Sequence, residues 1–107
     1  MKITIQRNDL LDAVSKVRTV VSAKSALPIL SHILFEATDS SVKLSATDLK
    51  VSIECTAECS VQQPGSLTVS AQRLASILSE LPDGEIRLAL GENSVVTLES
   101  GSIQTKF

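Results

Sequence analysis

The sequence is poor in aromatic, histidine and cysteine residues, and it has no long hydrophobic run. Its 107 residues include no Trp or Tyr, two Phe, one His, two Cys, four Gly and three Pro. No segment approaches the roughly 20 consecutive apolar residues needed to cross a bilayer. The N-terminus has one Lys, after which apolar and polar residues alternate as in a strand, and this is unlike a signal peptide. We therefore expect a soluble, intracellular protein with a core of Leu, Ile, Val and Ala.

The residues that commonly carry out catalysis are scattered along the chain. His32 stands alone at the start of a predicted strand, where a histidine is more often structural or solvated than catalytic. Cys55 and Cys59 are about 13 Å apart along one predicted strand, whereas a disulfide needs Cα atoms within about 7 Å. Glu54 and Glu58 on the same strand are likewise too far apart for a catalytic dyad. We expect no enzyme activity, no metal and no other cofactor.

Positively and negatively charged side chains are nearly balanced in number. Ten Lys and Arg against twelve Asp and Glu give a net charge of −2 and a pI near 5.3, which argues against gripping nucleic acid by bulk charge. Lys16, Arg18, Lys24 and Arg73 nevertheless gather around two predicted helices and the loop after the first. Two explanations stay open: a weakly basic helix surface, or scattered charges that keep the helices solvated.

Two segments of the chain repeat one pattern at a spacing of 64 residues. Each begins with the alternation typical of a strand, continues through a polar break and ends with apolar residues at helical spacing. The sequence therefore predicts two copies of one structural unit. The segments are KITIQRNDLLDAV (2–14) and SLTVSAQRLASIL (66–78), and the matched positions are Ile3 with Leu67, Thr4 with Thr68, Ile5 with Val69, Leu10 with Leu74 and Val14 with Leu78.

Each copy continues with three alternating segments, so the predicted order is β-α-β-β-β, twice. Asn8 and Ser70 are the predicted N-caps of the two helices. Because the strands alternate and the helices are apolar on one side only, we expect an α+β domain. In it, two helices lie side by side on one face of an eight-stranded antiparallel sheet. The domain covers residues 1–107, with pseudo-repeats at about 1–62 and 65–107, and the predicted strands are 2–6, 29–38, 42–46, 51–61, 66–69, 86–90, 96–98 and 103–107.

Five motifs together resemble the first domain of the bacterial sliding clamp, the beta subunit of replicative DNA polymerase III. The match in order and spacing covers the whole chain, although each motif alone is weak. The motifs are MKITIQRNDLLDAV (1–14), ALPILSHILFEA (26–37), VKLSATDLKVSIE (42–54), PGSLTVSAQRLASILSELPDGEI (64–86) and LESG (98–101).

The resemblance implies a DNA-clamp fold and a non-catalytic role in replication. In this family three such domains form a subunit, and two subunits close head to tail into a ring around duplex DNA, with helices lining the hole. The ring tethers DNA polymerase III for processive synthesis in the cytoplasm, at the nucleoid. The polymerase and the clamp loader bind through later domains that are missing here. A stand-alone protein-interaction module with the same fold and no ring is the alternative.

The resemblance also implies roles for particular residues. Lys24 occupies a loop position where the family has a basic residue that touches DNA, and Lys16 and Arg18 lie on a helix that resembles a hole-lining one. Arg73 and Ile77 match positions in the interface between subunits.

The end of the chain aligns with the family in two ways. Without a gap, the basic and aromatic interface positions of the last strand are lost. With a turn two residues longer, Lys106 and Phe107 fall on the basic–aromatic pair, and this second alignment is our prediction.

Overall fold

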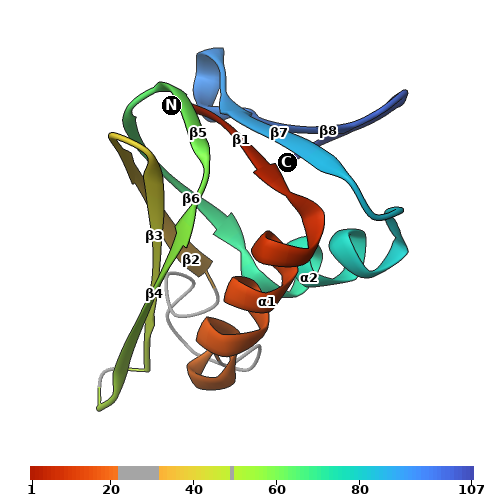
Figure 1. The fold of residues 1–107 in the computed structure, drawn as a ribbon. Helices are drawn as coiled ribbons and strands as arrows, with labels where there is room; N and C mark the ends of the chain where they lie inside the picture. Colours follow the sequence, from red (N-terminus) through yellow and green to blue (C-terminus); the bar gives the residue numbers. More distant parts are fainter. Residues whose placement is uncertain (22–31, 49) are drawn as a thin grey trace.

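Two antiparallel sheets and two helices make up the fold (Figure 1). The computed structural model describes residues 1–21, 32–48 and 50–107. In the described residues, no helix is long and apolar enough to cross a membrane. The elements are β1 (Lys2–Gln6), α1 (Arg7–Val17), η1 (Arg18–Val20), β2 (His32–Thr38), β3 (Ser41–Thr47), β4 (Ser52–Glu58), β5 (Ser60–Gln63), β6 (Gly65–Ser70), α2 (Ala71–Glu80), β7 (Glu85–Leu90), η3 (Glu92–Ser94), β8 (Val96–Ser100) and β9 (Ile103–Lys106).

The first strand of each repeat belongs to the sheet of the other repeat. The five-stranded sheet has the order β5-β1-β7-β8-β9, and the four-stranded sheet has the order β4-β3-β2-β6. Hence β1 pairs with β7, and its counterpart β6 pairs with β2. The two pairings have equivalent registers, which match Ile3 with Leu88 and Ile5 with Ile86 in one sheet, and Leu67 with Phe35 and Val69 with Ile33 in the other.

The predicted α+β class with two helices on antiparallel sheet is confirmed, but the single eight-stranded sheet is wrong. The described residues form nine strands in two sheets. The predicted strand 51–61 divides at Cys59, whose backbone N–H donates to the carbonyl of Ser40 (3.0 Å). Its first part, β4, joins the four-stranded sheet and its second part, β5, pairs with β1. Alternation continues across the break, so periodicity could not reveal it.

The N-cap predictions for the two helices have different outcomes. Ser70 is confirmed as the N-cap of α2, where its hydroxyl accepts the backbone N–H of Arg73 at 3.4 Å. Asn8 is wrong as the cap of α1, because this helix already begins at Arg7 and has no side-chain cap. The Asn8 side chain instead accepts a hydrogen bond from Arg7 Nη1 at 2.8 Å.

One core, aliphatic apart from Phe35, joins both helices to both sheets. The helices place their apolar sides on it and leave their polar sides exposed. Burial of these side chains provides the main driving force for folding. The helix residues in the core are Leu10, Ala13, Val14 and Val17 of α1 and Ala71, Leu74, Ala75 and Leu78 of α2.

We predict that Leu88→Ala lowers the free energy of unfolding by about 2–5 kcal/mol, because it leaves a cavity where the repeats meet. Leu88 is fully buried and pairs with Ile3 on one side and Leu98 on the other. Arg87→Ala, a change at the exposed neighbour, is the control and costs less than about 0.5 kcal/mol. Urea unfolding measures both. Equal losses for the two variants contradict the assigned register.

Candidate functional site

The polar side of α1 carries an ion pair. Lys16 Nζ lies 2.9 Å from Asp12 Oδ2, and the two side chains are 59% and 66% exposed. The residues are four apart, so they are neighbours on the helix surface. Leu10 and Val14, which are fully buried, mark the opposite side of the helix. The pair therefore lies on the exposed side of α1, opposite these two core residues.

Asp12 raises the pKa of the Lys16 ammonium, first through the hydrogen bond that it accepts and then through its negative charge. Lys16 therefore stays protonated across the physiological pH range, and the two charges cancel at a distance. A phosphate that approaches this surface meets a neutral pair rather than an isolated cation.

The predicted DNA-binding residues are only partly described. Arg18 begins η1 directly after α1 and is exposed. Lys24 lies outside the described residues. Arg73 belongs to a different feature, a groove between α2 and β9. The expected basic helix surface therefore reduces, within the described residues, to Lys16 and Arg18.

Arg7 has a structural role that sequence reasoning missed. Its Nε donates to the carbonyl oxygen of Leu78 at 3.0 Å, which connects the beginning of α1 to the last turn of α2. Its backbone N–H donates to the carbonyl of Gly84 at 2.7 Å. An arginine at this place satisfies a carbonyl that a helix end leaves without a partner. The two residues are 71 apart in the sequence, so no local pattern predicts the contact.

The four predicted interface residues meet in one groove of about 490 Å³. Arg73 and Ile77 come from α2, Lys106 is the last residue of β9, and Phe107 follows it. The groove runs along the edge of the five-stranded sheet, where β9, among the strands that the structure describes, pairs only with β8. Such an edge exposes backbone donors and acceptors that another strand can use. The groove thus combines an apolar centre, two cations and an open strand edge.

The pairing of β9 determines which side chains face α2. Thr105 lies opposite the buried Leu98 and therefore points to the helix side of the sheet. Phe107 follows two residues later, and its backbone N–H donates to the carbonyl of Val96 at 2.8 Å. It is partly buried and packs against the core. This arrangement brings Phe107 to the groove, while the alignment of Lys106 and Phe107 with the family's pair stays a prediction.

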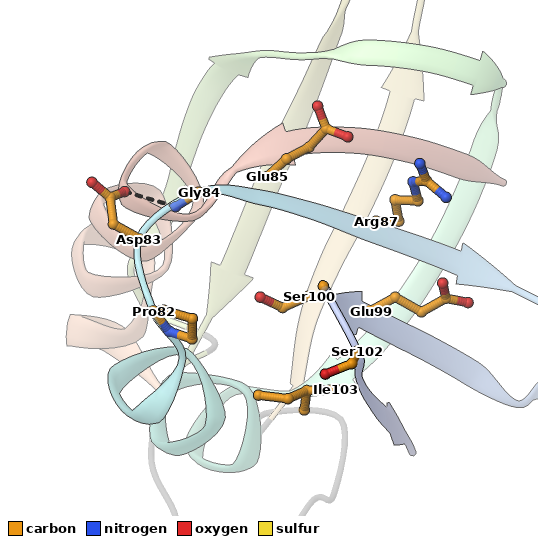
Figure 2. A pocket seen from close by; sticks show the side chains of 10 residues that line it. Pro82, Asp83, Gly84, Glu85, Arg87, Glu99, Ser100, Ser102 and Ile103 are labelled. Carbon is orange, nitrogen blue, oxygen red and sulfur yellow. Dashed lines mark hydrogen bonds between the residues drawn. The ribbon is translucent and has the colours of Figure 1, made fainter.

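A larger hollow, of about 580 Å³, lies near the end of α2 and the β8–β9 turn. Figure 2 shows that its acidic side chains and Arg87 are spread along the rim rather than directed at one point. One of them, Asp83, accepts the backbone N–H of Gly84 at 2.9 Å and so belongs to the turn. No cluster of His, Cys, Asp and Glu in the described residues could hold a metal ion. The hollow contains none of the predicted site residues.

Cys55 belongs to β4, Cys59 lies between β4 and β5, and both are free. Burial raises the pKa of the Cys59 thiol, which makes it a poorer nucleophile at neutral pH.

Comparison with known proteins identifies the family. The family described as DNA polymerase III beta subunit, N-terminal domain, matches residues 1–107. The chain belongs to this family. It is 34% identical over 102 residues to the beta sliding clamp of Chlamydia muridarum, and 36% identical over 103 residues to that of Caulobacter vibrioides. These alignments cover 95% and 94% of the chain and 28% of each relative.

Solved sliding clamps have the same fold as this domain. The structure titled Caulobacter crescentus pol III beta superimposes with a TM-score of 0.95 at 34% identity, over 99% of this chain and 29% of the other. The Bacillus subtilis sliding clamp superimposes with a TM-score of 0.94 at 27% identity, over 99% of this chain and 30% of that clamp. The predicted family and DNA-clamp fold are therefore confirmed. The chain spans less than a third of the length of these clamps.

Proposed function

We propose that this chain is the first domain of a ring that encircles duplex DNA and tethers DNA polymerase III during replication. The observation that carries the proposal is the match of both repeats, at a TM-score of 0.95, to a sliding clamp. In this role the domain is a non-catalytic processivity factor of the cytoplasm and nucleoid. Its polymerase and clamp-loader partners bind domains beyond this chain.

The charges of the domain suit a protein that slides along DNA. Its net charge is −2, so bulk attraction does not hold it on the duplex. Cations of the helices attract phosphates without reading bases, which makes the contact independent of sequence. In a closed ring, topology rather than affinity retains the protein. Lys24, Lys16 and Arg18 are the proposed phosphate-facing residues.

The groove between α2 and β9 is the proposed site of the second subunit, which packs head to tail. The open edge of β9 offers backbone hydrogen bonds, as in strand addition. Ile77 and Phe107 provide an apolar centre, and Arg73 and Lys106 provide charges at its rim. A stand-alone interaction module would use the same groove without forming a ring.

We predict weak duplex binding by this chain at low salt, with a clear loss on raising the salt concentration. Arg18→Glu and Lys24→Glu each weaken binding about three- to tenfold and lower the salt slope by about 1, because each removes a phosphate contact. Fluorescence anisotropy with a labelled duplex measures both quantities.

The control for these variants is Lys43→Glu, the same charge reversal on the sheet face away from the helices. Lys43 pairs with Glu36 across β2 and β3, at 3.5 Å. Equal losses for Arg18→Glu and Lys43→Glu, or binding that is insensitive to salt, would contradict a DNA-facing helix surface.

A chimera tests the subunit interface. We predict that this domain, fused to the later domains of the Caulobacter vibrioides clamp in place of that clamp's first domain, gives a dimer by sedimentation. Ile77→Asp weakens the dimer at least about 30-fold, equal to about 2 kcal/mol, because it buries a charge at the centre of the groove. Leu34→Asp, on the outer face of the four-stranded sheet, is the control and leaves the dimer intact. A monomeric parent chimera argues for the stand-alone module.

A further inference from the structure

We propose that Asp12 limits the affinity of this domain for DNA by neutralising Lys16 on the surface of α1. The helix can then lie close to the duplex without binding it tightly. The inference rests on the proposed function, because it assumes that this surface faces DNA.

The geometry of the pair supports this role. Asp12 Oδ2 and Lys16 Nζ are 2.9 Å apart, within the range of a charge-assisted hydrogen bond. Both side chains are more than half exposed on the side of α1 that faces away from the core. A phosphate that reaches Lys16 must therefore compete with a carboxylate that is already bound, and it is also repelled by that carboxylate.

The helices have little other positive charge. Asp9 and Asp12 offset Lys16 and Arg18 along α1 and η1, and Glu80 offsets Arg73 on α2. Arg7 is the remaining cation of these elements, and its guanidinium binds Leu78 and Asn8. These four cations and three carboxylates sum to +1, and Asp12→Asn raises the sum to +2, which is a large relative change.

The pair is not needed to hold the fold together. An exposed ion pair four residues apart on a helix adds little stability, because water screens it and both side chains lose freedom. The variant Asp12→Asn keeps the shape of the side chain and should fold like the parent. The effect of Asp12 on DNA binding can therefore be measured separately from an effect on folding.

A second ion pair provides a matched control. Glu36 and Lys43 form a similar exposed pair at 3.5 Å, with side chains 44% and 42% exposed. Both alternate with buried residues of β2 and β3, such as Phe35 and Leu44, so they point away from the helices. Glu36→Gln changes the net charge as much as Asp12→Asn does, but on the face that the ring turns outward.

The experiment compares duplex binding by the parent, Asp12→Asn, Lys16→Gln, the double variant and Glu36→Gln. Fluorescence anisotropy is recorded from low to physiological salt, and circular dichroism checks that each variant is folded. Asp12→Asn is expected to bind about three- to tenfold tighter at low salt, with a salt slope steeper by about 1. Lys16→Gln binds more weakly than the parent. The double variant returns to within about twofold of the parent, because its charge at these positions again sums to zero.

Three results would overturn the inference: Asp12→Asn binds no tighter than the parent, the double variant binds as tightly as Asp12→Asn, or Glu36→Gln gains as much. If Arg18→Glu weakens binding while Asp12→Asn changes nothing, only this inference fails. If no folded variant binds the duplex at any salt concentration, the DNA-facing surface fails together with it.

Discussion

The pairing of β1 with β7, and of β6 with β2, joins the two halves of the chain at the level of the backbone. Each repeat starts in the sheet of the other repeat, so neither half completes its sheet alone. Because α1 follows β1 and α2 follows β6 directly, the exchange also determines where both helices start. Both then bury their apolar sides in one shared core. The hydrophobic register of these two strand pairs is the constraint on which the rest of the fold depends.

The same exchange produces the candidate surfaces. It leaves the polar sides of α1 and α2 exposed, and the pair of Asp12 and Lys16 lies there. It also makes β9 the edge of the five-stranded sheet beside α2, which creates the groove that contains Ile77 and Phe107. The hydrogen bond from Arg7 to Leu78 connects the two helices where they meet. The helix surface is the one that we propose for DNA, and the apolar groove with its open edge is the one that we propose for a second subunit.

Local patterns predicted much of this fold. Alternation and helical spacing indicated both repeats, and the short polar side chain of Ser70 marked the start of α2. Such local patterns cannot show which strands pair when they are far apart in the sequence. The division of strand 51–61 depends on contacts of Cys59 and its neighbours with two different sheets, and alternation is the same on both sides of the break. The cap prediction for Asn8 failed because α1 already begins at Arg7, which places Gln6 at the N-cap position and Asn8 inside the helix.

The candidate surfaces were predictable to different degrees. The family resemblance pointed to Arg73, Ile77, Lys106 and Phe107, although only the fold brings the end of the chain against α2. The role of Arg7 depends on a partner 71 residues away. In contrast, Asp12 and Lys16 are four residues apart, a spacing that by itself predicts an ion pair on a helix. The predicted basic surface was built from the cations alone and therefore left Asp12 out.

The central claim is that the exposed residues of α1 and η1 face duplex DNA. The most direct test is a titration of the ¹⁵N-labelled chain with a short duplex at low salt, followed residue by residue by NMR. The account predicts shifts that centre on the exposed residues of α1 and η1, including Ser15 and Arg18. Residues on the outer faces of the sheets, such as Glu36 and Lys43, should stay unchanged. Shifts centred on those sheet faces, or no shifts at any residue, would contradict the account.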